Sequence, residues 1–517
     1  MTDGKILTEK LIEYAKFFLH LDPTDEIYTR NLLLRELHLA SPYSGKLDLS
    51  GIKELDVPDT LSAELGAYAL ENNLCRDGEE GLFSAHILGL LTPAPSVINA
   101  EFNRLRSAEG ERAACDYLYG ISVKNNYIQK TAISRNLWWQ FKDGEKTLEV
   151  TINLSKPEKD NKDIAKLLTK KPTDGEKYPA CLLCKENVGY GGTLTHPARS
   201  NIRTVNLTLG GKSWFVQYSP YAYYNEHCIA IADDHHPMSI DETTPDKLFD
   251  FVDIFPNYFI GSNAALPIVG GSILNHEHFQ GGGYILPMQK AEVEIPLYSK
   301  DYPTVSGGIL DWYNSAMRFK SKDREALSSL TKKIIEEWKK YSNESSGIYA
   351  ETDGIQHNTL SPIASKDGEY YVMNIILRNN ITSEEYPDGV FHAHPEYFNI
   401  KKEGIGLIEA MGLFILPGRL KRQTAEIEKI LTGEVSLDEK ALCEGDDLYV
   451  HRDMICALKK EAGGKVDRES ARSLVTNYIN RVCASILDCT AVFKRNTKEG
   501  REGFLDFAKV CGLEVHP

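Results

Sequence analysis

The chain has 517 residues, of which 42% are hydrophobic and 26% are charged, and its formal net charge is −15. This length exceeds what one small hydrophobic core organises, so we expect two or more domains of ordinary soluble composition. The negative charge argues against a general nucleic-acid-binding protein and against a protein that binds an anionic membrane surface. A local group of hydrogen-bond donors could still bind a nucleotide.

The sequence gives no signal for export or membrane insertion. The first ten residues lack the basic and then apolar pattern of a signal peptide, and apolar runs such as residues 405–416 are too short to span a bilayer. Ten cysteines are scattered along the chain without the spacing of a disulfide framework. We therefore expect a soluble cytoplasmic protein in which most cysteines are core residues or metal ligands.

The N-terminal region is predicted to be mostly helical. A capped helix begins at Thr24, and apolar residues recur at helical spacing in residues 7–21, 61–70 and 99–121. Residues 148–154 alternate in polarity, which indicates a strand. The polar residues 155–177 predict a boundary loop with a short helix inside it. We expect the helical region to cover residues 1–160.

Strands and helices are mixed from residue 179 onwards. Runs rich in β-forming residues predict strands at residues 203–209, 213–218, 227–232, 370–377 and 389–394. Helical periodicity predicts helices at residues 245–259, 324–341 and 420–517, whereas residues 407–416 fit a helix or a strand. This composition indicates the α+β class. The triplet His276-Glu277-His278 is echoed by His392-Ala393-His394, which favours two copies of one α/β unit.

The glycine-flanked segment of residues 270–282 carries the strongest chemical signal. Its residues His276, His278 and Gln280 alternate, so in an extended segment all three point to one face, about 7 Å apart. Flanking glycines let a phosphate approach closely. One imidazole could attack a phosphorus atom while the other groups hold oxygens. A purely structural role is less favoured, because a core strand rarely faces three polar groups inward.

The pair Cys181 and Cys184 has the CxxC spacing with which two thiolates hold one zinc ion. The two further ligands would come from His235, His236 and His276. Since His235 and His236 are adjacent, at most one of them can face a shared site. A redox pair is not favoured, because a thioredoxin-like context is missing, but two ordinary cysteines remain an alternative.

A second histidine cluster consists of His357, His392 and His394, with Glu396 and Glu409 near it in the sequence. His392 and His394 would share a face in an extended segment. A second metal site, a substrate-binding face and a solvated edge are all open interpretations of this cluster.

Four segments of the sequence resemble the type 2 galactose-1-phosphate uridylyltransferases of bacteria: residues 218–228, 266–282, 391–396 and 405–413. The similarity extends over nearly the whole chain. Ala265 stands where the family is expected to have an acidic residue, and Asn275 where it is expected to have a small one. Neither position belongs to the His-x-His-x-Gln core.

The resemblance implies a fold and a reaction. The fold has two histidine-triad-like repeats, at residues 161–300 and 301–430, with antiparallel sheets flanked by helices and a helical region at 431–517. The reaction is a ping-pong exchange of UMP between UDP-glucose and galactose 1-phosphate in galactose metabolism, and relatives suggest a homodimer. There are two competing hypotheses. The first is a nucleotide phosphorylase or hydrolase of the same superfamily. The second is a nucleotide-binding or scaffold protein that holds structural zinc and has no catalytic activity.

The resemblance also assigns roles to residues. His278 would be the nucleophile that takes UMP, Gln280 would hold the transferred phosphoryl group, and His276 would bind structural zinc. A neutral carboxamide at Gln280 favours transfer over hydrolysis, because it cannot supply a proton to a leaving group. The zinc ligands would be Cys181, Cys184, His235 and His276. The substrate-binding residues would be Asn263, Gly271, Ser272, Glu409, His392 and His394.

Overall fold

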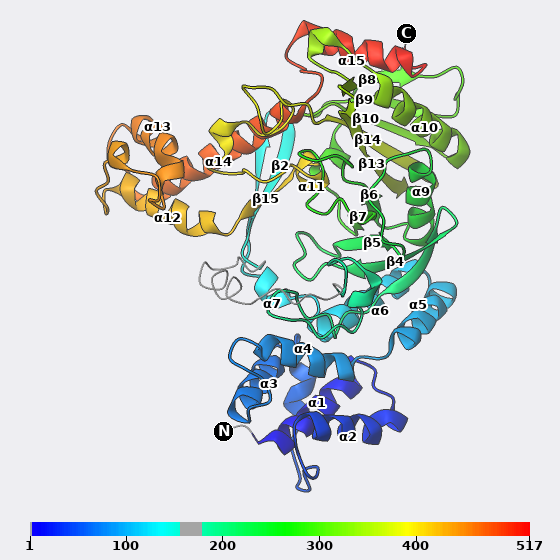
Figure 1. Ribbon diagram of the computed structural model, residues 1–517, viewed down its shortest axis with the longest axis vertical. Helices are drawn as coiled ribbons and strands as arrows, with labels where there is room; N and C mark the ends of the chain where they lie inside the picture. Colours follow the sequence, from blue (N-terminus) through cyan, green and yellow to red (C-terminus); the bar gives the residue numbers. More distant parts are fainter. Residues whose placement is uncertain (1–2, 156–177, 517) are drawn as a thin grey trace. The chain divides into compact units, whose positions relative to one another are not determined.

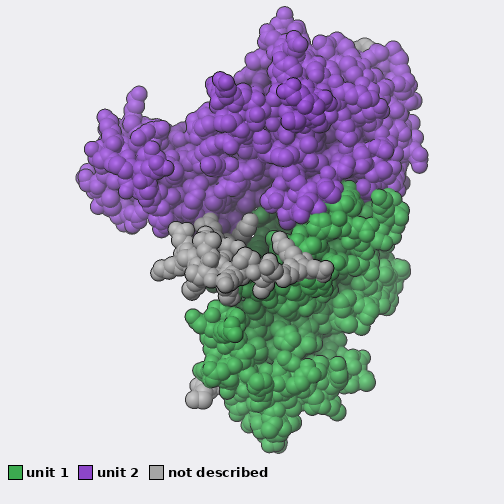
Figure 2. Space-filling view, viewed as in Figure 1, with its two compact units in different colours: residues 1–135, 155–236, 276–282 green, residues 136–154, 237–275, 283–517 purple. Residues whose placement is uncertain are grey.

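The computed structural model describes residues 3–155 and 178–516, so nearly all of the predicted boundary loop at 155–177 lies outside the described residues. The chain forms two compact units, and each is assembled from separate stretches of sequence (Figure 2). Unit 1 comprises residues 1–135, 155–236 and 276–282. Unit 2 comprises residues 136–154, 237–275 and 283–517. The four sequence regions predicted above stay a prediction.

Unit 1 begins with helices, as predicted (Figure 1). Asp3 caps the first helix by accepting a hydrogen bond from the Lys5 N–H. The predicted helix at 99–121 is interrupted at Gly110, where one helix ends and the next begins. The helices are α1 (Gly4–Phe18), α2 (Glu26–Glu36), α3 (Asp59–Glu71), α4 (Glu80–Leu91), α5 (Pro95–Glu109), α6 (Glu111–Lys124) and α7 (Lys130–Ile133).

The sheet of unit 1 is antiparallel and has the strand order β3 (Val205–Leu209), β4 (Lys212–Tyr218), β5 (Cys228–Ala232), β7 (His278–Gly282). The three predicted strands at 203–232 are thus confirmed. Within the predicted extended segment at 270–282, only residues 278–282 form a strand, and His276 lies at a bend before it. Phe279 stacks on Trp214 at 4.8 Å between ring centroids, which fixes one face of β7 in the core.

Unit 2 contains a larger antiparallel sheet, against which α9 (Thr244–Ile254) and α10 (Arg324–Lys340) pack (Figure 1). A smaller sheet joins β1 (Leu137–Asp143), β2 (Lys146–Asn153) and β15 (Leu413–Pro417), with β2 and β15 parallel. A short hairpin pairs β11 (Glu351–Thr352) with β12 (Ile355–Gln356). The strand order of the larger sheet is β16 (Glu514–Val515), β8 (Val293–Tyr298), β9 (Ser306–Leu310), β10 (Ala316–Ser321), β14 (Tyr370–Asn379), β13 (Asn358–Asp367), β6 (Phe259–Gly261).

Two predictions for unit 2 need correction or refinement. Residues 389–394 form a loop and not a strand, so His392 and His394 do not share a strand face. Residues 407–416 divide into α11 (Leu407–Ala410) and β15, because Gly412 adopts a φ of +98° between them. The C-terminal region is helical, as predicted, with α12 (Arg419–Thr432), α13 (Arg452–Ala462), α14 (Arg468–Thr490) and α15 (Lys498–Val510).

Helices and antiparallel sheets together confirm the α+β class, whereas the two histidine-triad-like repeats stay a prediction. Among the described residues, no single helix has the length and apolar composition needed to cross a membrane. Taken together, α4 and α5 have that length and apolar composition, but a bend of 57° separates the two helices.

Candidate active site and metal centre

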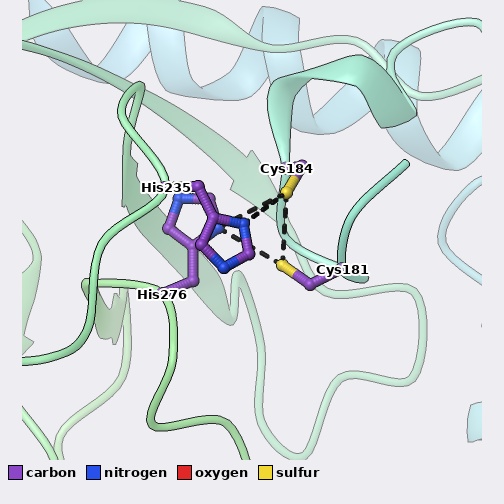
Figure 3. A group of neighbouring side chains, drawn as sticks. All are labelled: Cys181, Cys184, His235 and His276. Atoms are coloured by element: carbon purple, nitrogen blue, oxygen red, sulfur yellow. Dashed lines mark hydrogen bonds between the residues drawn. The ribbon is translucent and has the colours of Figure 1, made fainter. Parts of the chain in front are cut away.

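Four side chains of unit 1 converge from three segments of the chain (Figure 3). Cys181 and Cys184 lie in the loop before a short 3-10 helix, His235 follows β5, and His276 precedes β7. The two sulfurs are 3.4 Å apart. The Nδ1 atom of His276 is 3.3 Å from the Cys181 sulfur, and the Nδ1 atom of His235 is 3.0 Å from the Cys184 sulfur. All four donor atoms lie within 4.8 Å of one another.

This arrangement fits a tetrahedral zinc ion. Zinc bond lengths place neighbouring ligand atoms about 3.3–3.8 Å apart, close to the separations in this cluster. His276 Nε2 is 2.9 Å from the Ala232 carbonyl oxygen, which can only accept, so Nε2 carries the hydrogen. The Nδ1 lone pair therefore faces the sulfurs, as a metal ligand requires. Burial raises the pKa of the Cys184 thiol to about 11, and a divalent cation would oppose that shift by stabilising the thiolate.

Backbone and side-chain hydrogen bonds hold the CxxC segment in this shape. Asn187 donates from Nδ2 to the carbonyl oxygens of Cys181 and Cys184, at 2.9 and 2.8 Å. Its Oδ1 atom accepts a hydrogen bond from His196 Nε2 at 2.7 Å. The Leu183 N–H lies 3.3 Å from the Cys181 sulfur. The sulfurs are therefore positioned by their own loop as well as by the histidines.

His235 and His236 point in different directions, as their adjacency predicts. His235 faces the sulfurs, whereas His236 Nε2 lies 3.5 Å from a carboxylate oxygen of the buried Glu277. His236 is therefore not part of the cluster, and the ligand set proposed from the sequence is the one that the structure brings together.

His278 begins β7 and is only 5% exposed. Its Nδ1 atom is 2.8 Å from the carbonyl oxygen of His276, so Nδ1 is the protonated nitrogen and Nε2 keeps its lone pair. Burial lowers the pKa of the imidazole below its ordinary value, which favours the neutral ring. Alternation along β7 puts Gln280 on the same face as His278, opposite Ile229 of β5.

All of the substrate-binding residues expected from the sequence lie in unit 2, and several of them have defined hydrogen-bond partners there. Asn263 Oδ1 accepts a hydrogen bond from the Leu407 N–H at 2.8 Å, and Gly271 lies beside the Asn263 carboxamide. Glu409 accepts from Lys401 Nζ at 2.9 Å and from the Gly406 N–H at 3.1 Å. Ser272 is exposed.

The second histidine cluster does not assemble. His392 Nε2 accepts from the Ile405 N–H at 3.1 Å, and burial lowers its pKa to about 4. His394 stacks on Tyr386 at 4.0 Å, and its Nε2 donates to the Val390 carbonyl. Among the residues that the structure describes, the cluster around Cys181 is the one group with metal-ligating geometry. His357 contacts Thr352 and Asn380 instead.

Sequence reasoning missed Arg378 in the neighbourhood of His392. This guanidinium on β14 is fully buried and donates from Nη2 to the Ile405 carbonyl at 3.0 Å. Burial lowers its pKa to about 10, while the nearby Glu409 carboxylate acts in the opposite direction. A lone arginine within an apolar strand run gives no sequence signal for such a position.

Comparison with known proteins identifies the relatives of this chain. Residues 23–237 match the family model for the N-terminal domain of galactose-1-phosphate uridyl transferase, and residues 251–442 match the model for its C-terminal domain. The galactose-1-phosphate uridylyltransferase of Caldanaerobacter subterraneus subsp. tengcongensis is 43% identical, covering 99% of both chains. Its counterpart in Fusobacterium nucleatum subsp. nucleatum is 41% identical, covering 98% of both chains.

A solved structure, yeast Ap4A phosphorylase Apa2, is 10% identical with a TM-score of 0.31, covering 64% of this chain and 89% of that one. A likeness at this level supports no further argument. The sequence relatives are decisive: the protein is an enzyme of the nucleotidyltransferase class, as the sequence predicts. Within that class, the chain belongs to the galactose-1-phosphate uridylyltransferase family.

Proposed function

We propose that the protein exchanges UMP between UDP-glucose and galactose 1-phosphate through a covalent uridylyl-histidine at His278. The observation that carries this proposal is the fixed tautomer of His278. Its Nδ1–H is committed to the His276 carbonyl oxygen at 2.8 Å, so a neutral, buried ring offers its Nε2 lone pair for attack.

In the first half-reaction, His278 Nε2 attacks the α-phosphorus of UDP-glucose. A phosphorus–nitrogen bond forms, the bond from the α-phosphorus to the bridging oxygen breaks, and glucose 1-phosphate leaves with the electron pair. In the second half-reaction, a phosphate oxygen of galactose 1-phosphate attacks the same phosphorus. The phosphorus–nitrogen bond then breaks, so His278 recovers its lone pair and UDP-galactose is released.

Gln280 is proposed to hold the transferred phosphoryl group from the same face of β7. Its amide N–H can donate to a phosphoryl oxygen, but the carboxamide has no proton to give to a leaving group near neutral pH. An intermediate in such a site would wait for a sugar phosphate to accept UMP. This property favours transfer over hydrolysis.

Cys181, Cys184, His235 and His276 are proposed to hold a zinc ion, which when bound would act structurally by fixing its ligands in place. The consequence for the chain itself follows from His276. The carbonyl oxygen of His276 accepts the His278 Nδ1–H, so a fixed backbone at His276 orients the nucleophile.

Residues of unit 2 are proposed to bind the substrates. Glu409 would accept hydrogen bonds from hexose hydroxyls, because a carboxylate can accept from two adjacent hydroxyls. The remaining candidates are Asn263, Gly271, Ser272, His392 and His394. Two histidine-triad-like repeats and a homodimer stay predictions from the resemblance, and a cytoplasmic location stays a prediction from the sequence pattern.

An exchange assay decides the reaction. Labelled glucose 1-phosphate should enter UDP-glucose without any galactose 1-phosphate, because the first half-reaction is reversible through the covalent intermediate. Diadenosine polyphosphate, the substrate type for the competing phosphorylase or hydrolase, should turn over far more slowly. Exchange that requires galactose 1-phosphate, or faster turnover of the diadenosine compound, would overturn the proposal.

A further inference from the structure

Another histidine of unit 1, His227, lies next to Gln280. His227 is one residue before β5, whose residues Cys228 and Ile229 pair with Gly281 and Gln280 of β7. On the other side of β5, the pairing with β4 continues through His227, because its carbonyl oxygen accepts from the N–H of Ser219, the residue after β4, at 2.8 Å. Alternation therefore puts the His227 side chain on the face that carries Ile229 and Gln280.

Glycine at position 282 lets the loop before β5 approach the end of β7 closely. A Cβ atom there would lie 2.5 Å from the Glu226 carbonyl oxygen and 3.0 Å from the Tyr224 ring. The Glu226 side chain is anchored by Arg112 of α6, whose Nη2 lies 2.8 Å from it. The loop before β5 is thus fixed close to the end of β7.

His227 is buried as a neutral ring. It is 3% exposed, and it stacks on Tyr223 and tilts against Tyr224 at centroid distances of 5.2 and 4.7 Å. Burial lowers its pKa to about 4, and the neighbouring Gln280 carboxamide acts in the opposite direction. Among the described residues, neither ring nitrogen of His227 has a partner that meets the distance and angle of a hydrogen bond. The neutral ring can therefore still donate one hydrogen bond and accept one.

Gln280 needs such a neighbour to act on a phosphoryl group. A carboxamide has an acceptor end and a donor end of nearly equal size, and only the donor end attracts phosphoryl oxygens. A flipped carboxamide would present its oxygen and repel them. An N–H donor directed at Gln280 Oε1 removes this ambiguity, because it stabilises the orientation in which the amide N–H groups face away from the donor.

We propose that His227 is a positioning residue that donates to Gln280 Oε1 and thereby presents the Gln280 amide N–H to the transferred phosphoryl group. This inference rests on the proposed uridylyl transfer, and it assigns no contact between His227 and the substrate. The neutral imidazole suits the role, because it holds the carboxamide without adding a charge beside the nucleophile.

A double-mutant cycle tests the inference. His227→Phe keeps a planar ring but removes both nitrogens, and it should slow uridylylation of His278 by about tenfold, the effect of one orienting hydrogen bond. Gln280→Ala should slow it further, and adding His227→Phe to Gln280→Ala should change nothing more. His227→Gln, which retains an N–H donor, should recover part of the rate. Independent, multiplying effects, or a normal rate in His227→Phe, would overturn the proposal.

Two controls separate this role from a loss of packing and from failure of the proposed function. His451→Phe makes the same change at another buried histidine with a pKa lowered to about 4, and it should keep the wild-type rate. If wild type shows no exchange, the proposed function fails. If wild type exchanges but the cycle is multiplicative, only the positioning role fails.

A spectroscopic measurement decides the case even if His227→Phe does not fold. In Gln280→Glu, a carboxylate replaces the acceptor beside His227, and the histidine pKa followed by NMR should rise by about one unit or more. An unchanged His227 pKa would show that the two side chains do not interact, and would overturn the proposal.

Discussion

Asn187 allows the metal cluster to be tested without replacing a proposed ligand. Asn187→Ala removes two donor bonds to the carbonyl oxygens of Cys181 and Cys184 and the acceptor for His196. At about 1 kcal/mol for each net hydrogen bond, the segment loses about 2–3 kcal/mol of support. If most of this loss destabilises the metal-bound protein and not the metal-free protein, zinc affinity should drop about 30- to 150-fold.

The assay is competition with chelators of increasing strength, with zinc content measured on the folded protein. Asn201→Ala is a matched control, because Asn201 is also buried and donates to a backbone carbonyl, that of Asn125, at 2.9 Å. It should lower the free energy of unfolding while leaving zinc affinity unchanged. Equal zinc retention in the two variants would refute this reasoning about the segment, and wild-type protein without zinc would refute the metal site itself.

Three further predictions follow from the site and its surroundings. His278→Gly should abolish exchange while the protein stays folded, and free imidazole should restore some transfer; label from the uridylyl group found on His276 of wild type would contradict the assignment. Glu409→Ala should impair the galactose 1-phosphate half-reaction more than uridylylation of the enzyme; equal losses in both half-reactions would count against a hexose contact. The same variant should cost about 3–5 kcal/mol of stability, because the buried Lys401 ammonium loses its counter-charge and keeps only the Ile415 carbonyl oxygen as a partner. Burial lowers the pKa of His451 from 6.5 in the unfolded chain to about 4 in the folded protein. As the pH falls from 6.5 to about 4, the unfolded chain therefore binds a proton that the folded protein does not, and stability is lost. Urea unfolding at pH 7 and pH 5 should show about 2 kcal/mol less of this loss in His451→Gln than in wild type; the same loss in both proteins would contradict the effect.

Local sequence patterns were sufficient for the parts of the site that are short in sequence. The CxxC spacing predicts two sulfurs that can share a ligand, and they lie 3.4 Å apart. The alternation of His276, His278 and Gln280 predicts one common face; β7 provides it for His278 and Gln280, whereas His276 lies at a bend before the strand. Adjacent histidines predict that only one of His235 and His236 joins the cluster, as observed. These inferences hold because strand alternation and side-chain reach are set by covalent geometry.

Other sequence inferences failed where the backbone departs from the average behaviour of its residue types. Residues 389–394 have β-forming composition, yet Gly389 has a φ of +115° and the segment is a loop. His392 and His394 therefore bind backbone groups separately and do not form a pair on one face. Gly110 and Gly412 interrupt elements that periodicity alone would continue.

The sequence by itself determined the family, the α+β class and the position of the His-x-His-x-Gln motif, because these depend on residue identities and on spacings of a few residues. The tertiary structure decided which distant residues meet. It brought His235 to Cys184 across 51 positions of the chain and His276 to Cys181 across 95 positions. It also placed His227 beside Gln280 and buried Arg378 near His392. Such contacts depend on strand order and on the packing of loops, which no local pattern encodes.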